Sequence, residues 1–339
     1  MFRPNFSYNN DIVNKLLEIN SIRDFIVNAP VVMDIEVSLK REALLKSAHH
    51  STAIEGNPLS LNQVDKLAQG LKIRAQKKGE QEVLNYLNVL KNLDKYPEEG
   101  KITEKTILKL HENITHYTLE YTYLEGHYRT IPVYVVNKNG DVVFTPPPDN
   151  LVPQKMQNFL DWINKLSGEF NPVIVAGIIH YEFVRIHLFV DGNGRTARAL
   201  ATLYLHMKEF NVDFTLDEYY DNDRQAYYDA LNSVDLVTQD LTKWLEYFLE
   251  GFLISISEIK DRIILFPVDA QKKMRLSPKH LKIIEYIRLN GSITNSEVQK
   301  LLNISRQGAY KDLRGLMDKE LIEKKGGSRS TYYILKSNK

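Results

Sequence analysis

The sequence predicts a mainly α-helical protein with one β-hairpin in its body and a small winged-helix domain at its C-terminal end. Long stretches with helical periodicity fill most of the chain up to residue 265. Around residues 129–145 short apolar runs instead flank Asn139-Gly140, which is the pattern of a hairpin. After residue 277 three helical patterns precede a strand pattern, and that order is typical of a winged helix.

Length and composition set the broad class. The 339 residues are too many for one ordinary core, and we expect an N-terminal helical region (1–110), a central core (111–265) and a linker with the winged helix (266–339). The chain lacks a membrane-length apolar run and a signal-like start, so we expect a cytoplasmic protein that contacts no membrane. The absence of cysteine excludes disulfides, thiolate metal sites and cysteine nucleophiles.

Helices follow one another through the body. The first two are expected over 11–28 and 33–55, and Gly56 ends the second. Helical pattern continues over 60–95, with Gly70 and Gly79 as expected interruptions. The remaining helices are expected after a Thr103 cap and over 151–167, 172–186, 195–210, 223–232 and 240–264.

The C-terminal part is basic, whereas the rest is acidic. Residues 275–339 contain 14 Lys or Arg against 6 Asp or Glu, and the remainder contains 30 against 37. The two parts should therefore meet different partners. Helices are expected over 278–290, 295–302 and 305–319, and a strand over 330–335.

The third of these helices and the wing carry the residues expected to contact DNA phosphates and bases. They are Arg306, Gln307, Tyr310, Lys311 and Arg314 on the helix, and Lys324, Lys325 and Arg329 in the wing. A winged helix can equally serve protein contact or dimerisation, and its fold alone does not decide between these uses.

Residues 187–198 read HLFVDGNGRTAR and lie between two helical patterns. Gly192 and Gly194 allow backbone N–H groups to converge on an anion, and the following helix directs its positive end to the same place. Arg195 and Arg198 are three residues apart and share one side of that helix. Together these features predict a phosphate site.

Two further residues of this stretch suggest chemistry at that phosphate. The Asp191 carboxylate is the kind of hard ligand that Mg²⁺ prefers when phosphates supply further oxygens. His187 titrates near neutral pH, as a general base should. The spacing is not that of a Walker A loop.

This stretch resembles the Fic family motif H-P-F-x-[DE]-G-N-G-R-x-x-R, with Leu188 in place of the proline. The resemblance covers roughly residues 35–250 and implies a Fic-type helical bundle that uses ATP and Mg²⁺. His187 would then deprotonate a target hydroxyl for in-line attack on the α-phosphate, and Asp191 would hold Mg²⁺. The other implied roles are loop anchoring for Phe189, phosphate binding for Gly192, Asn193 and Gly194, leaving-phosphate contact for Arg195 and γ-phosphate contact for Arg198.

The resemblance also assigns the hairpin. It would be the family's flap, which holds a target segment as an added strand. Thr130 to Val133 would lie near the nucleotide. Tyr227-Tyr228 resemble a tyrosine pair on the adenine side, although two tyrosines on a helix are more often part of a core.

A second motif occurs N-terminal to this region. Residues 51–56 read STAIEG, in which Ser51 and Glu55 share a helical face. The string resembles the family's inhibitory motif [ST]-x-x-x-E-[GN], here ending at Gly56, and places an inhibitory helix at about 33–56. We expect Glu55 to pair with Arg198 and so block productive ATP binding; the same glutamate could instead orient a water for AMP removal.

The leading interpretation is a self-inhibited protein adenylyltransferase that moves AMP to a Ser, Thr or Tyr hydroxyl. Its target would be a protein, the chain itself included, and its oligomeric state is open, a homodimer being one option. One alternative is transfer of UMP, phosphate or phosphocholine, which the Asp191 and Arg198 pattern disfavours. Another is a DNA-binding transcription regulator whose body only senses nucleotide, which salt-dependent DNA binding would favour.

Overall fold

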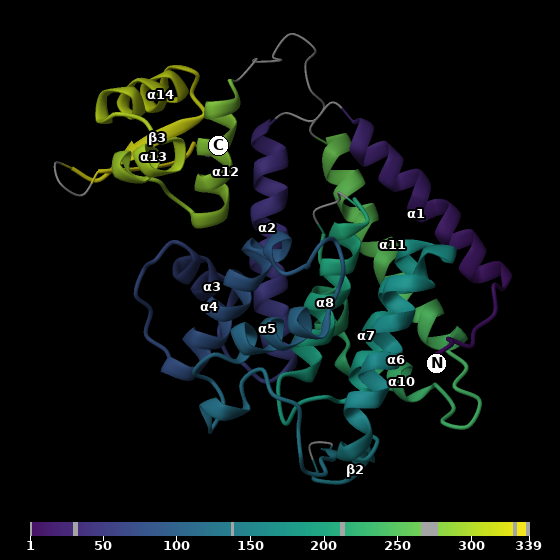
Figure 1. Cartoon of the computed structure of the whole chain (residues 1–339). Coiled ribbons are helices and arrows are strands. Elements are labelled where there is room, and N and C mark those ends of the chain that lie inside the picture. Colours follow the sequence, from purple (N-terminus) through teal and green to yellow (C-terminus); the bar gives the residue numbers. More distant parts are fainter. Residues whose placement is uncertain are drawn as a thin grey trace.

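The computed structural model describes residues 2–29, 33–136, 139–210, 214–265, 277–327 and 331–336. Figure 1 shows a helical body, with a small C-terminal unit lying beside the upper end of helix α2. Two separate two-stranded antiparallel sheets complete the described part of the chain. The prediction of a mainly helical fold is confirmed. No helix among the described residues is both long enough and apolar enough to cross a membrane.

The body helices follow the expected pattern with a few shifts. Their bounds are α1 Asn10–Asn28, α2 Met33–Ile54, α3 Leu61–Ala68, α4 Lys77–Lys91, α5 Glu104–Thr115, α6 Val152–Lys165, α7 Pro172–Ile186, α8 Asn193–Met207, α9 Asp217–Asn222, α10 Arg224–Asn232 and α11 Thr242–Leu265. Short 3-10 turns lie at Leu93–Lys95, Thr122–Leu124, Asp149–Leu151 and Ser167–Glu169. Helix α9 was not predicted from the sequence.

One expected helix break is wrong. Gly70, in the left-handed region at φ 74°, follows α3 as expected, whereas Gly79 lies within the first turn of α4. The Asn57 side chain packs against Gly79 and donates a hydrogen bond to its carbonyl at 3.0 Å. This hydrogen bond connects the turn after α2 to the start of α4.

The core of the body forms around α7, which is buried on nearly every side and packs against α8 and α11. Gly177 allows α11 to pack closely against α7, because a Cβ at this position would lie 2.9 Å from Leu245 and 3.0 Å from Phe248. Trp244 donates its indole N–H to the Gly177 carbonyl at 2.8 Å. One hydrophobic core joins the N-terminal helices to the rest of the body. The domain boundary that we expected at residue 110 lies inside α5.

The hairpin is shorter than expected. Strands β1 (Val135–Val136) and β2 (Val142–Phe144) pair antiparallel, with a register irregularity between Val135 and Val136. Ile131 and Val133 precede the paired segment. Pro132 lies between them and has no N–H to donate to a strand partner, which limits how far pairing can extend.

The C-terminal unit has the order of a winged helix. Its elements are α12 Pro278–Asn290, α13 Asn295–Leu302, α14 Arg306–Asp318, β3 Ile322–Lys325 and β4 Tyr332–Leu335. Ile293, in the short stretch expected before α13, forms an antiparallel bridge with Tyr333 of β4. The expected linker at Pro267 and the wing residue Arg329 lie outside the described residues.

Candidate active site

The loop between α7 and α8 is folded tightly on itself. His187 ends α7 in the left-handed conformation at φ 53°, and Gly192 caps α8 at φ 79°. Phe189 is fully buried and stacks on His111 with ring centroids 3.6 Å apart. The Asn193 amide accepts from the Phe189 N–H at 3.0 Å and donates to its carbonyl at 2.8 Å. Both polar atoms of this side chain are thus hydrogen-bonded to Phe189, and they hold the loop closed on itself.

The two glycines open space at the start of α8. A Cβ on Gly192 would lie 2.7 Å from Thr115. A Cβ on Gly194 would collide with the Glu55 carboxylate and lie 3.1 Å from Arg198 Nη1. Glycine at these two positions thus lets Thr115 and the Glu55 carboxylate approach the start of α8, where the helix dipole favours a negative charge.

Arg198 is enclosed by the end of α2. Its Nη2 donates to Glu55 Oε1 at 2.9 Å and to the Ser51 carbonyl at 2.8 Å, and its Nε donates to Ser51 Oγ at 2.7 Å. The arginine side chain is only 2% exposed, whereas that of Glu55 is 35% exposed. The structure therefore brings Ser51, Glu55 and Arg198 together, and Gly56 ends α2 beside them at φ 93°.

A second carboxylate, missed by the sequence analysis, lies on the same guanidinium. Asp217 Oδ1 is 3.2 Å from Arg198 Nε, and Asp217 Oδ2 accepts from Ser47 of α2 at 2.5 Å. Burial lowers the pKa of Arg198, but the acidic groups around it, Glu55 the largest, outweigh burial and the net shift is upward. Nη1 is buried without a hydrogen-bond partner among the described residues, which fits a group that awaits an anion.

Arg195 lies one turn before Arg198 on α8. It is buried, and its Nη2 is 3.3 Å from Asp191 Oδ1. Its Nη1 is 3.9 Å from Glu82 of α4, an ion pair without hydrogen-bond geometry that the sequence analysis also missed. Within the described chain the Nε and Nη1 of Arg195 are buried without a hydrogen-bond partner.

His187 has the tautomer and charge state of a base. Its Nδ1 lies 3.2 Å from the Val184 carbonyl, so Nδ1 carries the proton and the Nε2 lone pair is available. Burial lowers the pKa of His187, and the Val184 carbonyl opposes this only in part. The imidazole is therefore neutral at neutral pH.

Arg129 joins this loop to the hairpin and was not foreseen. Its Nε donates to the His187 carbonyl at 2.7 Å, and its backbone N–H donates to the Leu188 carbonyl at 2.9 Å. Its remaining nitrogens donate to Ile131 at 3.2 Å and Pro147 at 2.5 Å, one on each arm of the hairpin. No local spacing marks this residue, because all its partners except Ile131 are distant in sequence.

His111 makes a similar connection from α5. Its Nδ1 accepts from the Gly126 N–H at 2.9 Å, so its Nε2 carries the proton and donates to the Asp191 carbonyl at 2.9 Å. Burial lowers the pKa of His111 to about 4. A neutral imidazole thus fixes the backbone of the residue expected to hold a metal.

The residues expected on the adenine side divide between core and surface. Tyr227 is buried and its hydroxyl is 2.8 Å from His180 Nε2, so it belongs to the core. Tyr228 is 41% exposed. Partial burial raises the pKa of its hydroxyl, and the nearby Glu55 carboxylate raises it further. Val133 is half-buried in the segment before β1.

The site fits a metal that arrives with phosphates. Among the described residues no group of three or more His, Asp or Glu is arranged to hold an ion unaided. Asp191 is 52% exposed, and its two side-chain contacts, to Gly192 and Arg195, both use Oδ1. Magnesium is commonly bound by one or two carboxylates together with substrate phosphates, so this single carboxylate suits it.

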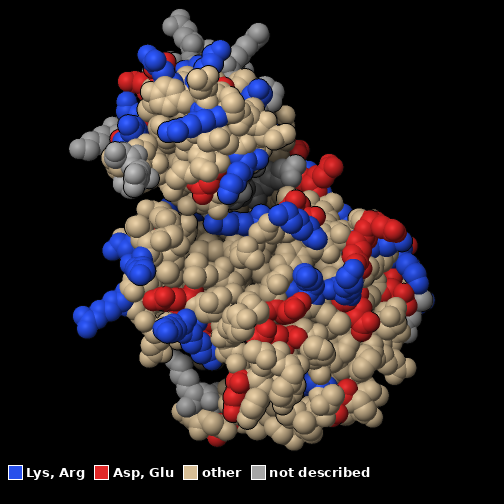
Figure 2. Space-filling model, turned by 60° about the vertical axis from the view of Figure 1, so that its left-hand side comes forward, with Lys and Arg blue, Asp and Glu red and all other residues tan. Residues whose placement is uncertain are grey.

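The expected DNA-contacting residues lie on α14 and β3 of the winged helix. Figure 2 shows Lys and Arg side chains spread over the upper unit of the molecule. Every described member of the expected set is exposed: Arg306, Gln307, Tyr310, Lys311, Arg314, Lys324 and Lys325.

Comparison with known proteins gives two family matches. Residues 101–205 match the Fic/DOC family, and residues 276–323 match a family described as winged helix-turn-helix DNA-binding. Curated relatives include "Protein adenylyltransferase Fic" of Drosophila willistoni, 34% identical over 173 residues, covering 49% of this chain and 32% of the relative. The protein of the same name from Aedes aegypti is 28% identical over 291 residues, covering 80% and 54%. The chain thus spans about a third to a half of these relatives.

Solved structures agree on the fold. A Fic family protein from Desulfovibrio desulfuricans G20 superposes with a TM-score of 0.67 at 24% identity, covering 100% of this chain and 99% of the other. Residues 134–508 of Fic-1 from C. elegans superpose with a TM-score of 0.61 at 25% identity, covering 75% and 72%.

Proposed function

We propose that this chain, which carries a domain of the Fic/DOC family, transfers AMP from ATP to a hydroxyl side chain of a protein. One observation supports this more than any other. A neutral histidine, an exposed carboxylate and two buried arginines lie at the glycine-rich N-terminus of α8. That arrangement suits charge stabilisation of a polyphosphate with one base beside it.

The reaction follows from the positions of these groups. His187 Nε2 takes the proton of the target hydroxyl while the hydroxyl oxygen forms a bond to the α-phosphorus. The bond from that phosphorus to the bridging oxygen breaks, and pyrophosphate leaves. Arg195 and Arg198 stabilise its negative charge, and Mg²⁺ held by Asp191 would neutralise charge on the phosphates.

The hairpin would bind the target. Val136, Val142 and Val143 are each about half-exposed on a sheet of only two strands, whose outer edges can accept an extended segment. Arg129 holds both arms of this hairpin to the His187 loop. A segment added there would present its hydroxyl near the base, and a second copy of this chain could supply it.

Glu55 would act as the brake. Its carboxylate occupies Nη2 of the arginine that we assign to the γ-phosphate, and it also lies against Gly194. ATP would then bind with its phosphates misplaced. Removal of AMP, with Glu55 orienting a water, remains the alternative role of the same residue.

The test uses ATP labelled at the α-phosphate, with Mg²⁺ and a cell lysate. Glu55→Gly should label protein strongly and wild type weakly, because only the variant frees Arg198. His187→Ala introduced into Glu55→Gly should abolish the label. If Glu55→Gly labels nothing, AMP transfer is refuted.

A second candidate function is DNA binding. The family match over residues 276–323 and the exposed basic residues of α14 and β3 support it. Mobility of a labelled duplex at increasing salt would test it, since phosphate contacts weaken steeply with ionic strength.

A further inference from the structure

Helix α2 belongs to two hydrophobic cores at once. Its C-terminal turns carry Ser51 and Glu55 on Arg198. Near its other end, Val37 is 4% exposed and packs in the core of the winged helix with Ile283 and Ile287 of α12. The brake and the winged helix are therefore joined by one continuous helix.

A second contact reinforces this docking. Gly291, which follows α12 at φ 81°, lies against Gln69 and Arg41. A Cβ there would lie 2.7 Å from the Gln69 side chain and 3.1 Å from the Arg41 guanidinium. Figure 1 shows α12 alongside the upper half of α2, away from the Glu55 end.

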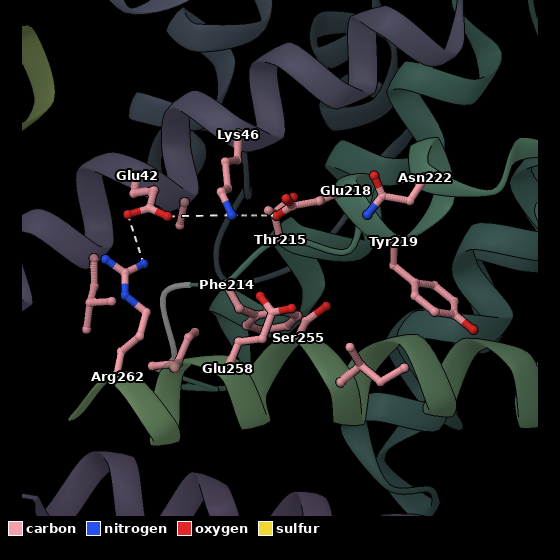
Figure 3. A pocket seen from close by; sticks show the side chains of 14 residues that line it. Glu42, Lys46, Phe214, Thr215, Glu218, Tyr219, Asn222, Ser255, Glu258 and Arg262 are labelled. Carbon is pink, nitrogen blue, oxygen red and sulfur yellow. Dashed lines mark hydrogen bonds and ion pairs between the residues drawn. The ribbon is translucent and has the colours of Figure 1, made fainter. Parts of the chain in front are cut away.

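The helix between these two ends can transmit a displacement. Residues 37 and 55 lie about 27 Å apart along the axis, at about 1.5 Å per residue. Ion pairs hold the intervening face to the body, as Figure 3 shows for Glu42 with Arg262 at 2.8 Å and Lys46 with Glu218 at 2.7 Å. These pairs are partly exposed and add only modestly to the attachment of α2 to the body, whose core also contains Leu45 and Ile54 of α2.

The basic face of the winged helix remains open in the docked state. Tyr310 is 54% exposed, and Lys311 and Arg314 beside it on α14 are also exposed. Docking uses α12 and the turn after it, so a ligand on α14 need not displace α2 directly. The ligand chemistry that fits this face is duplex DNA.

We propose that duplex DNA bound to α14 weakens the docking of the winged helix on α2 and so releases the Glu55 brake. Residues 1–274 carry 37 acidic and 30 basic side chains, so the phosphates of bound DNA bring like charge towards the body. Undocking leaves Val37 without its partners, and α2 can then shift at its other end. This inference rests on the proposed AMP transfer, whose brake it regulates.

The experiment measures both ends of the linkage in the full chain. A short random-sequence duplex should raise the wild-type labelling rate about 5-fold or more, the lower end of usual coupling factors. Glu55→Gly should label at a rate that DNA does not change, because its brake is already lost. Lys311→Ala/Arg314→Ala should lose the DNA response.

The reciprocal readout requires no transfer. By linkage, Glu55→Gly should bind a fluorescent duplex more tightly than wild type, because loss of the Glu55 contact favours the undocked state. Tighter binding by a variant that labels nothing would refute AMP transfer and leave the linkage standing. A duplex that does not bind, or that binds equally to both and leaves the wild-type rate unchanged or lower, overturns the inference.

A substitution at the docking contact provides an independent check. Val37→Asp places a charge in the shared core and should raise the wild-type labelling rate without DNA. Val237→Asp, at a valine that is 91% exposed, is the matched control and should not. Equal rates for the two variants would contradict the role of this contact.

Discussion

His111 should make the stability of the body depend on pH. Its pKa falls from 6.5 to about 4 on folding because burial penalises the charged ring. A lowered histidine pKa means that the unfolded chain binds the proton more tightly. Stability is therefore fully present above about pH 6.5 and is lost as the pH falls towards 4. Between about pH 7.5 and pH 5 this one group should cost about 2 kcal/mol.

The substitution His111→Gln isolates that contribution. Glutamine retains an N–H that can donate to the Asp191 carbonyl but cannot ionise. It loses the stacking on Phe189, which lowers stability equally at both pH values. The fall in unfolding free energy between the two pH values should thus be about 2 kcal/mol smaller in the variant than in wild type.

Urea unfolding followed by tryptophan fluorescence measures this. Both tryptophans, Trp162 and Trp244, lie buried in the body, so the signal reports that unit and not the winged helix. His127→Gln, at an exposed histidine close by, is the control and should keep the wild-type fall. An equal fall in wild type and His111→Gln would refute the reasoning.

Three further predictions concern transfer in the Glu55→Gly background. Arg129→Ala should lower kcat about 100-fold with little change in KM for ATP, because it misplaces the flap and base without touching phosphate; a change confined to KM would contradict this. Asp217→Asn should raise KM for ATP, since Arg198 loses the carboxylate that holds it once Glu55 is gone; unchanged KM would show that Ser51 suffices. The labelling rate should stay constant near neutral pH and fall only below about pH 6.5, where His187, with its lowered pKa, becomes protonated; a fall beginning above that pH would argue against this base.

Features within one helix or one loop could be predicted from the sequence. Spacings of three or four residues place side chains on one face, so Arg195 with Arg198 and Ser51 with Glu55 were identified as sets. The glycines at 192 and 194 indicated an open helix N-terminus in the same way. The predicted helix bounds agree closely with the structure where caps and prolines mark the helix ends. The predicted bounds of the hairpin agree less well, because Pro132 interrupts the alternation of apolar residues.

Contacts across the fold could not be predicted, because nothing local marks their partners. Asp217 and Glu82 look like ordinary surface acids until packing buries them beside Arg198 and Arg195. Arg129 and Val37 likewise acquire their roles only from distant segments. The sequence by itself determined which groups share the face at the start of α8, since backbone periodicity sets that face. The tertiary structure alone decided which buried charges pair with them and which domain packs on α2, because those pairings depend on how whole helices pack.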